Sequence, residues 1–289
     1  MFVAVLKSMR PHQWVKNAFV LAPLVFAQEL TNLDAVLRAA LATALFCAAS
    51  GAVYLMNDCF DVEKDRAHPT KRHRPIPSGA LPVPTAQRVA VAAAIGSVGI
   101  GAVLAPLFAV AVAAYLAVNV AYSRSLKHVP YIDVLTIAFG FLVRAVAGAL
   151  AIDVPVSVWL FACTFLLALY LGMGKRRHEL LAAEGNASKQ RRVLDAYDPS
   201  QLTMAMLGTA LATTAAYTAY AVEDHSLDFG TDRLPYTIPF CVIGLLRFFR
   251  LSSDASDPDS PTERMVTDPP FLLNLAAWGL LMLYLIYAS

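Results

Sequence analysis

Four polar residues directly after an apolar run carry the clearest chemical signal in the sequence. Asn57, Asp58, Asp61 and Asp65 follow the run at 36–56. If the helix continues through them, a turn of about 100° per residue places all four on one stripe. Carboxylates crowded in this way are costly unless a cation lies among them, and hard oxygen ligands suit Mg²⁺, or alternatively Mn²⁺, bridged to phosphate. The segment therefore predicts a metal site, with a solvated, capped helix end as the alternative.

A basic, proline-rich loop follows immediately. Its cations are Arg66, Lys71, Arg72 and Arg74. Cations beside a carboxylate and metal cluster indicate a polyphosphate substrate, because Arg can bind phosphate with two N–H groups and Lys supplies a point charge. Positive charge that only sets the membrane topology is the alternative for any one of them. His68 and His73 are expected to form hydrogen bonds within the loop rather than to bind zinc.

Two later loops also place cations at the end of an apolar run. They contain Tyr122, Lys127, Lys175 and Arg176. At the membrane face these groups could contact a lipid phosphate, and a topology signal explains them equally well. The glycines before Lys175 lack the strand, loop and helix setting of a P-loop.

Arg144 is a charged residue in the middle of an apolar run. An ionised side chain at that depth is costly and functional by default. On a helix, four residues lie within about 80° of one another, so this polar and small-residue stripe is expected to face the bundle interior: Asp133, Gly140, Arg144 and Gly148. Alternatively, Arg144 extends outward to the membrane surface or pairs with an acid such as Asp153, and Asp133 either binds metal or caps the helix.

Long apolar runs must position these polar segments. The chain has 289 residues, of which 58% are hydrophobic and 15% charged, against about 25% charged in a soluble domain. This composition excludes an ordinary soluble enzyme and predicts an all-α, polytopic membrane protein, since each run can cross a hydrocarbon core about 30 Å thick. We predict nine transmembrane helices, with a break at Ala105-Pro106, over residues 13–29, 36–56, 86–104, 107–122, 131–152, 155–173, 201–222, 234–251 and 270–288.

The distribution of Lys and Arg predicts the orientation. With the N-terminus inside, nearly all basic residues lie in or beside inner segments, as the positive-inside rule requires. A cleaved secretory signal ending near Ala27 is the competing interpretation of the first run. The net charge of +2 gives no reason to expect nucleic acid as a partner. We expect a single membrane domain over 1–289, with catalytic loops on the inner, cytoplasmic face at about 57–85, 123–130 and 174–200.

The motifs resemble those of the UbiA prenyltransferase superfamily. Asn57-Asp58-x-x-Asp61-x-x-x-Asp65 after an apolar helix is similar to the superfamily pattern that holds Mg²⁺ against a diphosphate. Four blocks spread along the chain resemble the decaprenyl-phosphate phosphoribosyltransferase branch. They are Arg10-Pro11-x-Gln13-Trp14-x-Lys16-Asn17, Asp65-Arg66-x-His68-Pro69-Thr70-Lys71-Arg72-x-Arg74-Pro75-Ile76-x-Ser78-Gly79, Arg144-Ala145-x-Ala147-Gly148-Ala149 and Gly174-Lys175-Arg176-x-x-Glu179-Leu180.

One departure distinguishes this chain from the aromatic prenyltransferases of the superfamily. Those enzymes carry a second Asp-x-x-x-Asp motif after the sixth helix, where this chain has Lys175-Arg176-Arg177-x-Glu179. A cationic site there suits a phosphorylated sugar and a lipid phosphate. An aromatic prenyltransferase that uses a prenyl diphosphate is the main alternative. A transporter or flippase predicts polar or broken helices at mid-membrane and often an inverted repeat, and neither is evident.

The resemblance implies a specific reaction. A 5-phosphoribosyl group would pass from 5-phosphoribosyl 1-diphosphate to a polyprenyl (decaprenyl) phosphate and release diphosphate. In the inner membrane of a bacterium, this would be a step toward a lipid-linked arabinose donor for the cell wall. Cations must neutralise the leaving diphosphate, whereas the anionic acceptor needs no strong general base. Self-association into a homo-oligomer is left open.

The resemblance also implies the roles of the site residues. The metal ligands are expected to be Asn57, Asp58, Asp61 and Asp65. The three carboxylates, together with Lys71 and Arg72, are the expected catalytic residues. Further substrate contacts are expected from Lys16, Asn17, Arg66, Arg74, Tyr122, Lys127, Arg144, Lys175 and Arg176.

Overall fold

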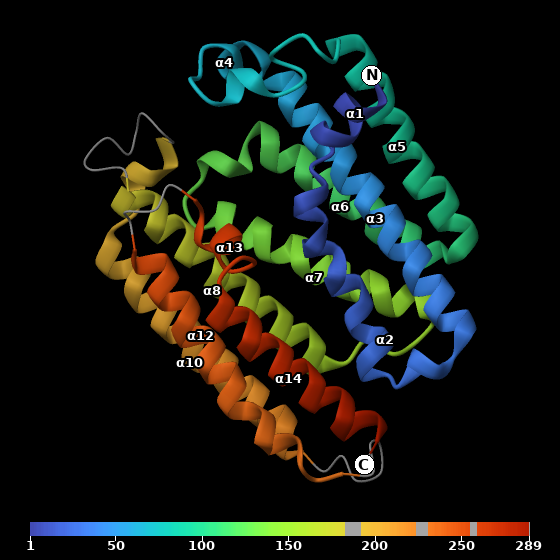
Figure 1. The fold of residues 1–289 in the computed structure, drawn as a ribbon, viewed down its shortest axis with the longest axis vertical. Helices are drawn as coiled ribbons and strands as arrows, with labels where there is room; N and C mark the ends of the chain where they lie inside the picture. Colours follow the sequence, from blue (N-terminus) through green and yellow to red (C-terminus); the bar gives the residue numbers. More distant parts are fainter. Residues whose placement is uncertain (183–191, 224–230, 255–258, 289) are drawn as a thin grey trace. The chain divides into compact units, whose positions relative to one another are not determined.

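The computed structural model describes residues 1–182, 192–223, 231–254 and 259–288 (Figure 1). This part of the chain consists of helices and their connections and contains no strand. It forms two compact units. The first combines Met1–Arg124 with Val143–Val156, and the second combines Ser125–Leu142 with Ser157–Ser289. The boundary therefore falls inside helix α7 (Ile132–Ile152).

The first unit is built on α3 (Leu33–Phe60). This helix begins at a cap, where the Asn32 side chain accepts hydrogen bonds from the backbone N–H groups of Asp34 and Ala35. It packs against α5 (Val83–Leu104) and α6 (Pro106–Arg124), the blue-green and green helices beside it in Figure 1. The shorter elements of this unit are α1 (Phe2–Ser8), η1 (Pro11–Leu21), α2 (Ala22–Phe26), η2 (Glu29–Thr31), α4 (Val62–Arg66) and η3 (Lys71–His73).

The break predicted at Ala105-Pro106 is confirmed. Ala105 has an extended backbone (φ −162°, ψ 128°) between the end of α5 and the start of α6. Proline lacks an N–H donor and disfavours the helical conformation in the residue before it. Arg38 stabilises this end of the unit, because its guanidinium donates to the carbonyl groups of Leu104 (3.1 Å) and Ala151 (2.8 Å).

The first predicted span is not a regular α-helix. Over 13–29 the structure has the 3₁₀ helix η1 followed by the five-residue helix α2, with Pro23 in the first turn of α2. Buried Asn17 lies in η1 and hydrogen-bonds to side chains of α3 and α7. The apolar composition predicted a regular α-helix over this segment, and the buried polar contacts of Asn17 together with Pro23 account for the irregular backbone found there. Among the described residues, seven helices are long and apolar enough to cross a membrane, rather than the nine predicted.

The second unit is a bundle of long helices. Its main members are α8 (Val158–Ala182), α10 (Pro199–Val222), α12 (Ile238–Ser253) and α14 (Pro269–Tyr287). α8 packs against α10 and α12, and α12 packs against α14. Tyr170, Met206 and Phe248 are buried in its core. The shorter elements are η4 (Leu126–His128), η5 (Arg192–Ala196), η6 (Leu234–Thr237) and α13 (Pro261–Arg264).

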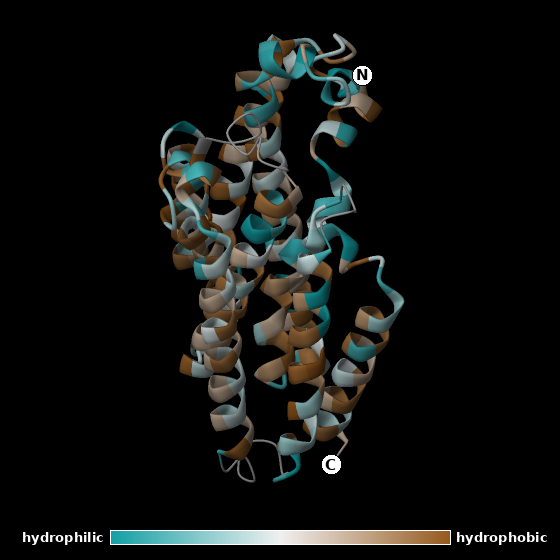
Figure 2. Cartoon of the chain, turned by 90° about the vertical axis from the view of Figure 1, so that its left-hand side faces the viewer, coloured by the Kyte–Doolittle hydropathy of each residue, from teal (hydrophilic) through white to brown (hydrophobic). Residues whose placement is uncertain are grey.

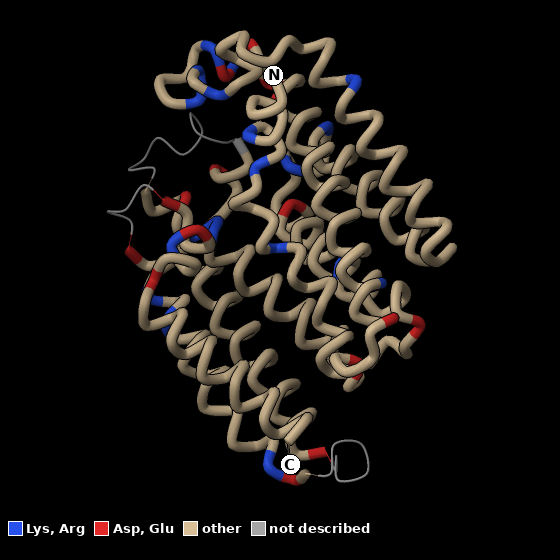
Figure 3. The backbone as a smooth tube through the Cα atoms, turned by 45° about the vertical axis from the view of Figure 1, so that its right-hand side comes forward, with Lys and Arg blue, Asp and Glu red and all other residues tan. Residues whose placement is uncertain are grey.

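One of the two predicted spans that are not among these seven helices corresponds to α10. It covers the predicted segment 201–222 but is not among the seven apolar helices, since it contains five threonines. Four of these threonines donate to the carbonyl four residues earlier, as Thr213 does to Thr209 at 2.7 Å, so their hydroxyls are satisfied within the helix. In both units apolar residues line the helices (Figure 2), and charged residues gather mostly at helix ends and loops (Figure 3).

Candidate active site

Two buried carboxylates of the acidic motif converge on one arginine of the basic loop. Asp58, near the end of α3, and Asp65, on α4, are each 3% exposed. Arg74 directs the same nitrogen, Nη1, at Asp65 Oδ2 (2.7 Å) and Asp58 Oδ1 (3.3 Å). Arg10, which precedes η1, donates Nη2 to Asp58 Oδ1 at 2.5 Å. The motif and the basic loop, predicted to act together, therefore do meet in the first unit.

The helix expected to run without a break through the acidic motif is interrupted at Asp61. α3 ends at Phe60, and Asp61 (φ −93°, ψ 7°) separates it from α4. The Asn57 side chain accepts a hydrogen bond from Ser123 (2.6 Å), while the Asp61 carboxylate forms none with the described residues. Within that part of the chain, no three His, Cys, Asp or Glu side chains are grouped closely enough to hold a metal by themselves. Because the backbone of Asp61 departs from the α-helical conformation, the rotation of about 100° per residue that the prediction assumed does not hold across this position.

The rest of the basic loop is organised by its own contacts. Arg66 donates to Glu63 (2.7 Å) and to the Pro77 carbonyl (3.3 Å), so its guanidinium is held within the loop. His68 Nδ1 accepts the backbone N–H groups of Thr70 and Lys71, which confirms it as a loop hydrogen bonder. Among the described residues, the Arg72 guanidinium donates to neighbouring His73, and the ammonium group of half-buried Lys71 forms no hydrogen bond or ion pair. Lys71 and Arg72 therefore keep their charged groups available.

Arg144 holds η1 against the helices. It is 6% exposed, and it donates Nε to Asn17 Oδ1 (2.8 Å) and Nη2 to Tyr115 Oη (2.9 Å). Asn17 in turn donates to Ser50 (3.2 Å). One turn along α7, a Cβ at Gly148 would lie 2.0 Å from the Val20 carbonyl oxygen, so only glycine allows η1 this close. The Arg-x-x-x-Gly spacing thus fixes η1 on α7.

The second unit contains a buried ion-pair network. Arg176, 1% exposed, donates Nε to Asp133 Oδ2 (2.6 Å) and Nη1 to Glu179 Oε2 (2.5 Å). Tyr197 donates its hydroxyl to Asp133 Oδ1 at 2.5 Å. Burial, and then the bond to Asp133, raise the pKa of Tyr197, so its hydroxyl stays protonated. Arg176 is therefore engaged within the protein and differs from the substrate-facing cation that was expected.

The remaining predicted site residues are three lysines and one tyrosine. Lys127 and Lys175 are half-buried, and their ammonium groups form no hydrogen bond or ion pair with residues that the structure describes. Lys16, on η1, and Tyr122, at the end of α6, are also half-buried. Residues 183–191 of the predicted loop 174–200 lie outside the described residues.

Nothing in the sequence gave a reason to assign a site role to Arg10 or Tyr197. Arg10 could have been noticed as part of the first block, whereas no spacing signal links Tyr197 to Asp133.

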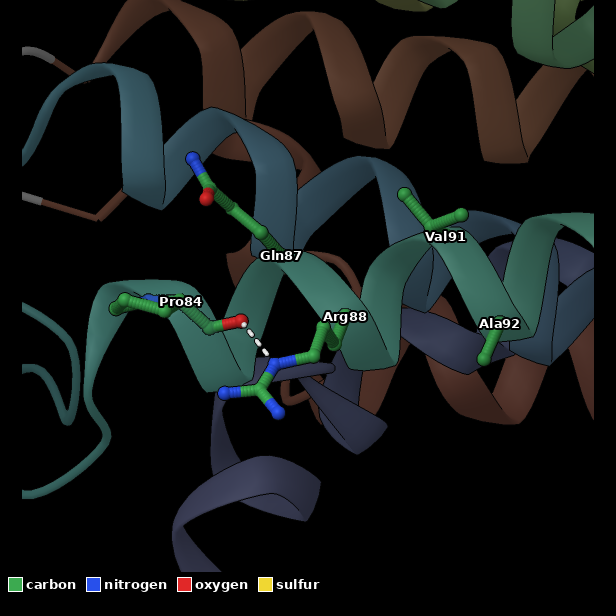
Figure 4. A pocket seen from close by; sticks show the side chains of 5 residues that line it. All are labelled: Pro84, Gln87, Arg88, Val91 and Ala92. Atoms are coloured by element: carbon green, nitrogen blue, oxygen red, sulfur yellow. Dashed lines mark hydrogen bonds between the residues drawn. The ribbon is translucent and has the colours of Figure 1, made fainter.

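A shallow hollow on α5 is separate from these clusters (Figure 4). Its lining comes from one face of a single helix, and Arg88 donates to the Pro84 carbonyl four residues earlier at 3.3 Å. Because no second element closes it, this hollow is an open surface rather than an enclosed substrate cavity. The lining residues are Pro84, Gln87, Arg88, Val91 and Ala92.

Comparison with known proteins identifies the family. The sequence model of the UbiA prenyltransferase family matches residues 18–276. The chain belongs to the UbiA prenyltransferase family. Solved UbiA structures share the fold: a UbiA homolog from Archaeoglobus fulgidus bound to GPP and Mg²⁺ superposes with a TM-score of 0.71 at 15% identity, over 99% of this chain and 98% of that one.

Curated relatives from three species carry the same name. Decaprenyl-phosphate phosphoribosyltransferase from Corynebacterium glutamicum is 35% identical over 98% of this chain and 86% of its own length. The enzyme of that name from Mycolicibacterium smegmatis is 35% identical over 94% and 89%. The one from Mycobacterium tuberculosis is 32% identical over 95% and 91%. This UbiA-family chain is therefore a multi-pass membrane protein similar along its length to these enzymes.

Proposed function

We propose that this protein is a decaprenyl-phosphate phosphoribosyltransferase. It transfers 5-phosphoribose from 5-phosphoribosyl 1-diphosphate to a polyprenyl phosphate, as a step toward a lipid-linked arabinose donor for the cell wall. The observation that carries this proposal is the near full-length similarity to three enzymes of that name, at 32% to 35% identity. The arginine-rich cluster around Asp58 and Asp65 supports it, since both substrates are phosphates.

The donor set of the first unit fits Mg²⁺. Mg²⁺ is commonly bound by one or two carboxylates together with substrate phosphates, so it needs no cage of three protein ligands. Asp58 and Asp65 each place a carboxylate oxygen near Arg74 Nη1, and the Asp61 carboxylate forms no hydrogen bond or ion pair with the described residues. We assign Asp58, Asp61 and Asp65 as metal ligands, with Asn57 beside them. When bound, Mg²⁺ would supply positive charge to the diphosphate leaving group.

The protein's own cations supply the rest of that charge. The bond from ribose C1 to the diphosphate oxygen breaks, the electron pair leaves with diphosphate, and an oxygen of the lipid phosphate forms the new bond to C1. Arg10 and Arg74 each use one terminal nitrogen on the carboxylates, which leaves further N–H donors for phosphate oxygens. Lys71 and Arg72 bind donor phosphate in the same unit. In the second unit, Lys127 and Lys175 are assigned to phosphate binding.

The orientation follows from the same cations. The positive-inside rule places the N-terminus and the basic loops on the cytoplasmic side of the bacterial inner membrane. On that side the loops meet a water-soluble sugar phosphate, while the polyprenyl tail lies among the apolar helices.

Radiolabelled 5-phosphoribosyl 1-diphosphate tests the proposal. The detergent-purified protein is incubated with labelled donor, Mg²⁺ and a polyprenyl phosphate, and the lipid phase is counted with and without EDTA. Label in the lipid that EDTA abolishes is the expected result. An unlabelled lipid phase, with prenyl transfer from a prenyl diphosphate to an aromatic acid, would instead identify an aromatic prenyltransferase.

A further inference from the structure

A buried polar network joins three segments of the second unit at the end that carries two lysines. Asp133, at the start of α7, is fully buried and binds both Arg176 of α8 and Tyr197. α8 approaches α7 closely, since a Cβ at Gly172 would lie 2.9 Å from the Val134 side chain. Three positions distant in sequence are therefore fixed relative to one another by charged hydrogen bonds in a site that excludes water.

The network reaches the loop that carries Lys127 through Tyr131. The Tyr197 hydroxyl accepts the Tyr131 backbone N–H at 2.7 Å while it donates to Asp133. The two rings pack edge to face, 5.0 Å apart, and the Tyr131 hydroxyl donates to Gln201 at 3.2 Å. Tyr131 has a left-handed backbone (φ 63°), which is unfavourable for a residue other than glycine. These contacts hold it there, four residues after Lys127.

The other end of the network fixes α8 beside Lys175. Arg176 uses Nε on Asp133 and Nη1 on Glu179, so its side chain is committed inside the protein. Its neighbour Lys175 is half-buried, and its ammonium group forms no hydrogen bond or ion pair among the described residues; the same holds for Lys127. A lysine ammonium is carried on a flexible side chain and loses more conformational entropy on binding phosphate than a preorganised group does. A rigid backbone at the lysine reduces that loss and so favours phosphate binding.

We propose that Asp133, Arg176 and Tyr197 are positioning residues that hold Lys127 and Lys175 ready to bind a substrate phosphate. They act through the two lysines and do not touch the substrate. The proposal rests on the proposed function for the identity of the substrates. It replaces the expectation that Arg176 itself contacts phosphate.

Tyr197→Phe tests this arrangement with the smallest change. It removes the hydroxyl that links Tyr131 to Asp133 and keeps the ring contact. Tyr217→Phe is the matched control, because Tyr217 is a buried tyrosine of the same unit whose hydroxyl bonds to Thr237 (2.7 Å) and Trp278 (2.8 Å). Both variants remove a buried tyrosine hydroxyl that forms at least two hydrogen bonds, and only Tyr197→Phe acts on the loop that carries Lys127.

The kinetic readout separates positioning from general damage. A contact to the ribose 5-phosphate, which takes no part in the bond changes at C1, stabilises the ground and transition states alike. Tyr197→Phe should therefore raise KM for one phosphorylated substrate by about fivefold or more and change kcat by less than about twofold. In a Lys127→Ala background the same change should raise KM no further, since the effect passes through that lysine. An effect equal to that of Tyr217→Phe, or one additive with Lys127→Ala, would overturn the proposal.

Hydrogen exchange gives a readout independent of turnover. Tyr197→Phe should speed amide exchange over residues 126–131, by about tenfold at Tyr131, whereas Tyr217→Phe should leave that segment unchanged. Unchanged exchange at Tyr131 would overturn the proposal even if activity fell. A wild-type protein that transfers no phosphoribose would refute the proposed function instead, and the exchange experiment would still decide whether Tyr197 holds the loop.

Discussion

Gly148→Ala tests how η1 is seated on α7. The added Cβ would lie 2.0 Å from the carbonyl oxygen of Val20 and 2.8 Å from its carbonyl carbon. Since the closest comfortable C···O contacts are about 3.3 Å, η1 must move by more than about 1 Å. The obstacle is backbone, so no side-chain rotation relieves it.

Overpacking of this kind costs about 1–3 kcal/mol. At about 2–4 °C per kcal/mol for a chain near this size, the apparent Tm should fall by roughly 2–12 °C. Phosphoribosyl transfer should fall as well, because η1 carries Lys16 and follows Arg10 directly.

Thermal unfolding in detergent, followed by tryptophan fluorescence, measures the effect. Gly96→Ala is the control, because Gly96 lies in helix α5 of the same unit with nothing within 4 Å of its added Cβ. Alanine is the better helix former by about 1 kcal/mol, so this control should melt at the wild-type temperature or higher. Equal melting temperatures for the two variants would refute the close contact between η1 and α7.

Three further predictions concern charged residues. Asp61→Asn should abolish metal-dependent turnover and leave Tm unchanged, since its carboxylate bonds to none of the described residues; full activity would refute its metal role. Lys175→Ala should reduce transfer at unchanged Tm, whereas Arg176→Met should destabilise the protein by about 3–5 kcal/mol, because it removes the partner of a buried carboxylate. The reverse pattern would contradict these assignments. The hydrogen bond from Arg247 lowers the pKa of Asp268, and a lowered pKa contributes stability above the unfolded value of about 3.9 that disappears in acid. Asp268→Asn should therefore lower Tm near neutral pH by an amount that shrinks as the pH falls below about 3.9, and a Tm difference independent of pH would exclude the ion pair as its cause.

Composition and local chemistry predicted the features that depend on neighbours in sequence. Apolar runs predicted the membrane helices, Ala105-Pro106 predicted a helix break, and the acidic motif beside the basic loop predicted the meeting of Asp58 with Arg74. Each of these follows from a short segment whose physics is largely independent of the rest of the chain.

The features that were missed depend on contacts between distant segments. The 3₁₀ form of η1 depends on Arg144, which lies 127 positions from its partner Asn17. The burial of Arg176 depends on Asp133, 43 positions earlier, and Tyr197 is 64 positions from the same carboxylate. The sequence shows only that such a cation has other cations as neighbours, so it is expected to bind substrate. The distant acidic partner that engages it is known only from the tertiary structure.

A competition between substrate pairs tests the proposed function most directly. The purified protein receives 5-phosphoribosyl 1-diphosphate with a polyprenyl phosphate, and a prenyl diphosphate with an aromatic acid, in one Mg²⁺-containing reaction. Mass spectrometry then identifies the lipid products. A polyprenyl phosphate that has gained one phosphoribosyl group, with one diphosphate released for each, is the predicted result. A prenylated aromatic acid with unchanged polyprenyl phosphate would contradict it.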